Sequence, residues 1–308
     1  MILLEQMFVL FVLMLVGIIC RKTGMMNDKV SKGMSGIVVN IASPAFIISA
    51  GLNNDEIVSN RQLLTCLLTS VFIYMGLILI AIFLPRIIKA KKSHYGTYRV
   101  MTIFSNIGFM GFPIVSATYG SLGLLYAAFF QFPFNLLIYT YGIRAMQYGT
   151  EEESEGGLSW KLVINAGVIA VFVSVVCYLT HIHVPGPVES VITGLSGLTV
   201  PMSMMVIGYA LGGMKLKDLF SDYRLMLFSV IKLIVIPIIG VFILKIFIRD
   251  TTLLGVCFIM IATPVASMTA MLAQYYGGDE ETASRGVALT TLLSVITIPL
   301  VGAICLRW

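Results

Sequence analysis

The sequence predicts an all-α integral membrane protein with ten transmembrane helices. Its 308 residues are 58% hydrophobic and only 11% charged, and the mean hydropathy is +0.96. A soluble globular domain has about 25% charged residues. The apolar residues are also grouped in runs of about 20 residues with few charges, the length that a helix needs to cross the hydrocarbon core of a bilayer. Almost no length is left for a soluble domain.

Ten such runs follow one another along the chain. They cover residues 3–20, 34–52, 62–84, 99–118, 122–143, 160–180, 190–211, 224–247, 252–274 and 286–306. Asn40 and Pro44 interrupt the second run and Pro201 interrupts the seventh, so these two runs are less uniformly apolar than the third and the eighth.

The basic residues predict how the helices are oriented. Of the 20 Lys and Arg residues, fifteen lie in loops after odd-numbered runs or at the adjoining edges of runs, four lie on the opposite side, and Lys232 alone lies well inside a run. The fifteen are Arg21, Lys22, Lys29, Lys32, Arg86, Lys89, Lys91, Lys92, Arg99, Arg144, Lys161, Lys215, Lys217, Arg224 and Arg285, and the four are Arg61, Lys245, Arg249 and Arg307. Because loops rich in Lys and Arg stay in the cytoplasm, we expect a multi-pass protein of the plasma membrane with both termini outside. The formal net charge of +5 is therefore a sign of topology and not of nucleic-acid binding.

A short acidic segment divides the ten runs into two sets of five. Residues 147–159 contain four glutamates, and we interpret them as a flexible cytoplasmic linker. The linker would join an N-terminal five-helix repeat at 1–146 to a C-terminal five-helix repeat at 160–308. Because five is odd, the second repeat enters the membrane in the opposite direction, as in an inverted repeat. Sequence traces of such a repeat are faint.

Two of the predicted spans contain residues that interrupt a helix. Ser105–Pro113 places an Asn, two Gly and a Pro in the middle of the uncharged run Val100–Thr118, and span nine has a similar interruption at Ala262–Ser267. In hydrocarbon each freed backbone group costs several kcal/mol unless protein, water or a ligand satisfies it, so both breaks should face protein or a wet cavity. Broken spans at corresponding places in two halves are typical of the binding site of a secondary transporter.

The polar and small residues at the break in span four are the first candidates for a binding site. The Asn106 amide offers donors and acceptors. It could bind a substrate carboxylate or a freed carbonyl, and the alternative is a hydrogen bond between helices. Gly108, Gly111 and Pro113 would shape the backbone rather than contact the substrate. They would let unwound amides and the start of a half-helix point at an anion.

The corresponding residues of span nine leave two alternatives open. Thr263 and Ser267 could satisfy the hydrogen bond that Pro264 cannot make, or they could supply oxygens to the substrate or to a coupling Na⁺. In span two, Asn40 and Pro44 form another polar kink, which either lines the site or is bonded structurally. We expect Asn40 to face the bundle, because an amide that faces lipid is costly.

Lys232 is the one charge well inside a predicted span. A Lys at the centre of a span costs about 2.5–3.5 kcal/mol on insertion scales. One interpretation is a counter-ion or a substitute for a bound cation. The other is a structural pair, or a side chain that reaches the cytoplasmic surface beside Arg224, about 12 Å away along the helix. No Asp or Glu lies near the middle of a predicted span, which argues against a carboxylate proton relay.

Motifs for catalysis and for cofactor binding are missing from the sequence. It has no HExxH, Walker A or GxSxG pattern. We therefore predict no enzyme activity, no catalytic residue, no resident metal, and no cofactor apart from a coupling Na⁺ or H⁺. The five cysteines are scattered singly through apolar runs, and we interpret them as reduced, buried small hydrophobic residues.

Four stretches of the chain carry a family resemblance. They are Asn40–Pro44 (NIASP), Asn106–Pro113 (NIGFMGFP), Lys232–Pro237 (KLIVIP) and Thr263–Ala266 (TPVA). With them, nearly the whole chain resembles the auxin efflux carrier family, which comprises the PIN-formed plant carriers and bacterial relatives such as malonate and malate permeases. The second stretch is the most specific, because N-x-G-x-x-G-x-P is an unusual pattern in a spanning helix.

The resemblance implies ten helices in a five-plus-five inverted repeat, with spans four and nine crossing as broken helices near the midplane. It also implies an organic anion as substrate and an elevator-type movement of a transport half against a scaffold half. By analogy, Asn106 and the backbone of Gly108–Pro113 would meet the carboxylate beside Thr263–Ser267. The short linker resembles the bacterial form, which favours a small mono- or dicarboxylate over auxin. Proteins of related folds are often homodimers.

Our hypothesis from the sequence is a secondary carrier, working by alternating access, for a small organic carboxylate such as malonate, malate or an auxin-like acid. The predicted substrate-binding residues are Asn40, Pro44, Asn106, Gly108, Gly111, Pro113, Lys232, Thr263, Pro264 and Ser267. Without an ATP-binding motif, the energy would come from an ion gradient, from the substrate gradient or from the membrane potential. The alternatives are a membrane sensor that uses the same pocket without net transport, a channel, and a membrane enzyme.

Overall fold

The computed structural model describes residues 2–52, 59–148, 165–180, 182 and 184–306. This part of the chain is built from helices and contains no strand, only an isolated bridge between Ser105 and Val265. The α-helices are α1 (Ile2–Lys22), α2 (Asp28–Ile37), α3 (Ser43–Leu52), α4 (Asn60–Ile87), α5 (Tyr95–Ile103), α6 (Phe112–Phe129), α7 (Gln131–Leu137), α8 (Ile143–Met146), α10 (Ala166–Thr180), α11 (Gly186–Ser196), α12 (Thr199–Gly212), α13 (Leu216–Leu219), α14 (Tyr223–Val230), α15 (Ile236–Phe247), α16 (Thr251–Ala262), α17 (Met268–Tyr275) and α18 (Glu280–Cys305). Shorter turns are the 3₁₀-helix η2 (Lys92–His94) and the π-helices η1 (Val38–Ala42), η3 (Ile107–Gly111), η4 (Ile138–Gly142) and η5 (Ile231–Val235).

Many of these helices are suited to a bilayer. Seven segments of the described chain are long and apolar enough to cross a membrane, namely Leu4–Lys22, Asp28–Leu52, Asn60–Ile87, Ile107–Met146, Gly186–Gly212, Tyr223–Phe247 and Glu280–Cys305. The predicted spans four and nine are broken, because α5 ends at Ile103 and α16 ends at Ala262. The interruptions are thus confirmed, whereas the number of ten crossings and the inverted repeat stay predictions.

The segment Ile107–Met146 has 40 residues, about twice the length that one crossing needs. Its backbone leaves helical geometry at Gly120, where φ is 64° and ψ is −155°. Glycine adopts this conformation without the steric penalty that a side chain would bring. The predicted boundary between spans four and five, at residues 119–121, falls at this kink.

The chain forms two compact units, and each unit draws on both halves of the sequence. Unit 1 consists of Met1–Cys66, Ile107–Phe132 and Ile164–Met214, and unit 2 consists of Leu67–Asn106, Pro133–Val163 and Lys215–Trp308. The division into repeats at 1–146 and 160–308 stays a prediction about the sequence, and most of the proposed linker, at 149–159, lies outside the described residues.

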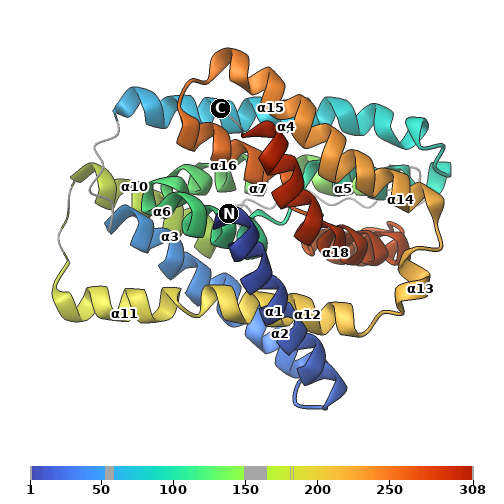
Figure 1. Cartoon of the computed structure of the whole chain (residues 1–308), viewed down its shortest axis with the longest axis horizontal. Coiled ribbons are helices and arrows are strands. Elements are labelled where there is room, and N and C mark those ends of the chain that lie inside the picture. The colour runs from blue at the N-terminus through green and yellow to red at the C-terminus, as the bar shows by residue number, and fades with distance from the viewer. Residues whose placement is uncertain (1, 53–58, 149–164, 181, 183, 307–308) are drawn as a thin grey trace. The chain divides into compact units, whose positions relative to one another are not determined.

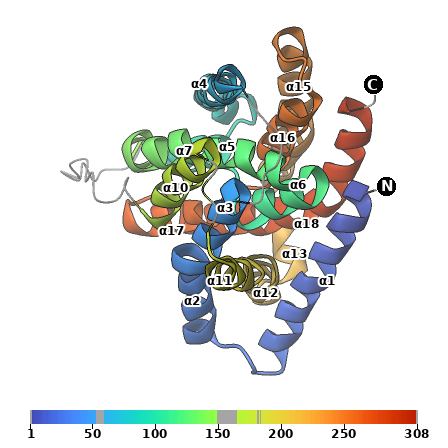
Figure 2. The same cartoon turned by 90° about the vertical axis from the view of Figure 1, so that its left-hand side faces the viewer.

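Unit 1 is held together by close helix packing. Helix α1 packs against α12, and α3 packs against α10 and α11 (Figures 1 and 2). A Cβ atom at Gly17 would collide with the main-chain oxygen of Met205, and one at Gly208 would collide with that of Met14. Small residues let membrane helices approach until their main chains touch, so the contact of α1 with α12 depends on these two glycines.

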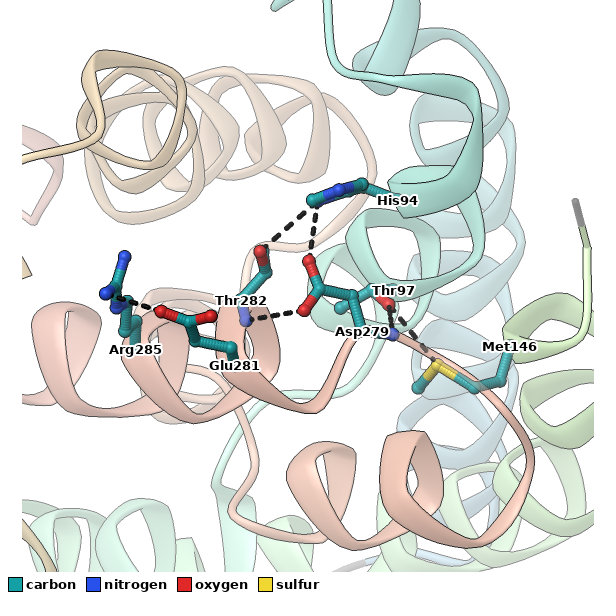
Figure 3. A network of polar contacts seen from close by, with 7 residues as sticks. All are labelled: His94, Thr97, Met146, Asp279, Glu281, Thr282 and Arg285. Atoms are coloured by element: carbon teal, nitrogen blue, oxygen red, sulfur yellow. Dashed lines mark hydrogen bonds and ion pairs between the residues drawn. The ribbon is translucent and has the colours of Figure 1, made fainter. Parts of the chain in front are cut away.

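In unit 2, the start of α5 is attached to the turn between α17 and α18 (Figure 3). His94 Nδ1 lies 2.6 Å from Asp279 Oδ2, and the main-chain N–H of Asp279 donates to Thr97 Oγ1 at 3.0 Å. Asp279 is also the N-cap of α18, because its Oδ1 accepts the Thr282 N–H at 3.1 Å. One carboxylate therefore caps α18 and holds the beginning of α5.

One basic residue that was expected in a loop lies in a helix. Arg99, counted above among the loop residues, lies in α5 and is buried, because this helix already begins at Tyr95. The Arg99 guanidinium stacks on the Tyr148 ring, 3.8 Å from its centroid. Such a cation–π contact provides a favourable partner for an arginine that is withdrawn from water.

The glycine contact in unit 1 gives a stability prediction. Gly208→Ala should lower the free energy of unfolding by about 1–3 kcal/mol, because the added methyl group overpacks the contact with α1. Gly194→Ala is the matched control in α11, since a Cβ at that position meets no atom within 4 Å. Thermal unfolding of the two purified variants in detergent compares them, and equal stability of Gly208→Ala and wild type would show that α1 and α12 do not approach this closely.

Candidate functional site

The two broken spans meet in unit 2. After α5 the chain is extended at Phe104, and after α16 it is extended at Thr263. The Asn106 N–H donates to the Pro264 carbonyl oxygen at 2.7 Å, and the Ala266 N–H donates to the Phe104 carbonyl oxygen at 2.9 Å. The interruptions therefore satisfy each other's backbone groups in a short antiparallel pair, which we call the crossing (Phe104–Asn106 with Thr263–Ala266).

A side chain from a third helix completes the crossing. The Val265 N–H donates to Thr290 Oγ1 of α18 at 3.1 Å, and Thr290 Oγ1 donates in turn to the Gly286 carbonyl oxygen at 2.6 Å. On the other side, the Phe104 ring packs edge-on against Phe134 with 5.5 Å between the ring centroids. The residues of the crossing are buried. Because water is excluded there, these hydrogen bonds supply the partners that the polar groups need.

Lys232 reaches the end of α5 from helix η5. Its side chain is fully buried, and Nζ donates to the Thr102 carbonyl oxygen at 3.0 Å and to Ser105 Oγ at 2.7 Å. The alternative that this side chain extends to the cytoplasmic surface is therefore wrong. Helix C-termini carry a partial negative charge, so the amine nitrogen lies where a helix end favours a cation.

Three further predicted residues belong to the same place in unit 2. Asn106 and Pro264 are both buried within the crossing, where they form one of its two backbone hydrogen bonds. Thr263 Oγ1 donates to the Met260 carbonyl oxygen at 3.1 Å and so satisfies a carbonyl at the end of α16. Ser267 is partly exposed and immediately precedes α17. Asn106, Thr263, Pro264 and Lys232 are thus brought together at the crossing, with Ser267 at the start of the next helix.

The glycines of the span-four motif do not form the unwound segment that the sequence predicts. Gly108 and Gly111 lie in η3, and Pro113 lies in the first turn of α6, all in unit 1. The extended part of the chain lies before Gly108 instead. A glycine can be part of a helical turn, and a proline fits the first turn of a helix without losing a hydrogen bond. In unit 1, Ser203 Oγ of α12 donates to the Phe109 carbonyl oxygen at 3.2 Å.

The polar kink in span two also differs from its prediction. Asn40 is exposed, and its Nδ2 donates to the Gly36 carbonyl oxygen at 2.9 Å. The expectation that this amide faces the bundle is wrong, because its own helix satisfies it. Pro44 follows at the start of α3 and is half-buried. Both residues belong to unit 1, whereas the crossing is built within unit 2.

Sequence reasoning missed Thr102, Ser105 and Thr290 as parts of this site. Ser105 could have been found, because a hydroxyl directly before Asn106 in an uncharged run is available to a buried donor. Thr102 takes part through its main chain, and Thr290 lies 25 residues beyond its partner Val265, so no local pattern marks either of them. In the part of the chain that the structure describes, no group of three or more His, Cys, Asp or Glu side chains could hold a metal ion.

Two neighbouring threonines test the crossing. Thr290→Val should lower the free energy of unfolding by about 1–3 kcal/mol, because it leaves the buried Val265 N–H without an acceptor. Thr291→Val is the matched control, since Thr291 is also buried in α18 but its hydroxyl donates only to the Val287 carbonyl oxygen of the same helix. Thermal unfolding in detergent measures the difference, and an equal loss in both variants would mean that Thr290 does not support the break.

Comparison with known proteins finds related transporters. The sequence matches the family described as membrane transport protein over residues 2–161 and 156–301. It is similar to an uncharacterized transporter of Methanocaldococcus jannaschii, with 25% identity over 99% of each chain. It is also similar to an uncharacterized transporter of Methanothermobacter thermautotrophicus, with 24% identity over 96% of each chain. Together the two matched ranges cover almost the full length, and the chain therefore belongs to the membrane transport protein family.

Proposed function

We propose that this transporter is a secondary carrier for a small organic carboxylate, with malonate or malate as the first substrates to test. The observation that carries the proposal is the crossing of two broken helices. Two helices end at the crossing (α5 and α16), and α17 begins directly after it. The start of a helix at such a break directs the positive end of its dipole at an anion, and crossings of broken helices are common substrate sites in carriers.

The charges around the crossing favour an anion over a cation. The negative end of α5 is compensated by the ammonium group of Lys232, while the positive end at the start of α17 has no acidic residue in its first turn. Asn106 adds a buried amide whose N–H groups can donate to a carboxylate. The proposed contacts are therefore the Asn106 side chain and the first turn of α17 with Ser267.

We propose that the transport cycle involves a movement between the two units. Alternating access would follow if unit 2 moved relative to unit 1 in an elevator-type motion. The division of the chain into two compact units supports this, since each unit has its own dense set of internal contacts. The energy would come from an ion gradient, from the substrate gradient or from the membrane potential, because the sequence has no ATP-binding motif.

Transport of a defined substrate is the direct test. We expect saturable uptake of one acid from a panel of malonate, malate, lactate and indole-3-acetate into proteoliposomes. Asn106→Ala should weaken substrate affinity at least about tenfold, because a hydrogen bond to a charged group is lost. Asn60→Ala is the control, since Asn60 lies exposed at the start of α4.

The other outcomes of this uptake experiment are equally informative. If uptake by Asn106→Ala equals that of wild type, the carrier function would stand and the substrate site would lie elsewhere. Ligand binding by the purified protein without uptake under any imposed gradient would favour a sensor over a carrier.

The proposed topology, with both termini outside the plasma membrane, has its own test. In a cysteine-free background, Asn60→Cys should react with a membrane-impermeant maleimide on intact cells, because it is the first residue of α4, on the predicted outer side. Lys91→Cys should react only after permeabilisation, because it lies in the basic loop after α4. The reverse labelling pattern would invert the orientation.

A further inference from the structure

The contacts of Lys232 have the character of a cation site. Its Nζ is fully buried and lies 2.7 Å from a hydroxyl oxygen, Ser105 Oγ, and 3.0 Å from a main-chain oxygen, that of Thr102. Carbonyl and hydroxyl oxygens are also the ligands that proteins offer to hard monovalent and divalent cations. In the described part of the chain, the ion pairs His94–Asp279 and Arg285–Glu281 do not include Lys232. Its two oxygen partners are therefore neutral groups.

The position of these oxygens explains why a cation is needed there. Helix α5 stops at Ile103, inside the unit, and its last carbonyl groups lack partners from a following turn. Phe104 N–H satisfies the Val100 carbonyl at 3.0 Å, whereas the Thr102 carbonyl accepts from Lys232. A helix end and an ammonium group that are both withdrawn from water compensate each other, since either alone would be costly.

The helix that carries Lys232 is shaped to deliver it. Residues Ile231–Val235 form the π-helical turn η5 between α14 and α15. A π-turn inserts one extra residue into the helix and changes the direction of the side chains around it, and such turns are frequent at functional sites. The Lys232 side chain is thereby directed at the end of α5, which lies 130 residues earlier in the sequence at Thr102.

We propose that the Lys232 ammonium group is a tethered cation that fills a monovalent-cation site at the end of α5. The transporter then needs no alkali cation at this site, and a variant with a short side chain binds a small monovalent cation in its place. One consequence of this inference rests on the proposed carrier function. In a carrier, the positive charge at the crossing would belong to the protein and not to a co-transported ion.

Thermal unfolding in different salts tests the site without any transport. Wild type, Lys232→Ala and Lys232→Met are unfolded in detergent with ammonium, sodium, potassium or choline chloride at equal ionic strength. Wild type should unfold at one temperature in all four salts. In choline chloride, Lys232→Ala should unfold at a lower temperature than wild type. In ammonium or sodium chloride, at a few times the dissociation constant of the cation, the unfolding temperature of this variant should rise by about 3 °C or more. Lys232→Met should show no such gain, because its side chain fills the space without a charge.

Two results of the unfolding experiment would contradict the inference. A higher unfolding temperature of wild type in sodium than in choline, or a Lys232→Ala variant that responds to no cation, would overturn the inference. If Lys232→Ala does not fold, the wild-type comparison still decides. An uptake assay that finds no substrate affects only the proposed function, because the unfolding experiment tests the site at the end of α5 without transport.

Discussion

The structure depends on one constraint, which is that backbone groups withdrawn from water must find partners. Breaking a helix in the apolar interior frees such groups, and this chain breaks two helices at the same place. Each extended segment supplies the acceptor that the other lacks, through Asn106 with Pro264 and Ala266 with Phe104. The two interruptions are therefore stable only as a pair, and the helices that lead to them are fixed by that pairing.

Charge is balanced at the crossing by a similar exchange between distant elements. Helix α5 would present a buried negative end, and Lys232 would be a buried amine without a partner. Brought together, the end of α5 and the Lys232 side chain remove two unfavourable features. At its other end α5 is held by Asp279 and His94 (Figure 3). This short helix is thus anchored at both ends within unit 2, which gives the crossing a defined geometry.

Much of the fold class could be predicted from the sequence, because apolar length and the placement of Gly and Pro are local properties. The breaks in spans four and nine were found in this way. The extended residues of span four were placed too late, at Gly108–Pro113, because glycine is compatible with both a turn and a helix. The partners of Lys232 could not be predicted, since they lie 127 and 130 residues away. The division into interleaved units likewise arises from packing and leaves no local pattern.

The sequence distance across the crossing also affects how the protein is made. Ser105 and Val265 are 160 residues apart, which corresponds to roughly 10–30 s of synthesis at ordinary translation rates. During that time the first broken span lacks the segment that completes its backbone hydrogen bonds. Unit 2 cannot close before its last segment, Lys215–Trp308, is synthesised, so the break in the first span stays open until its partner emerges.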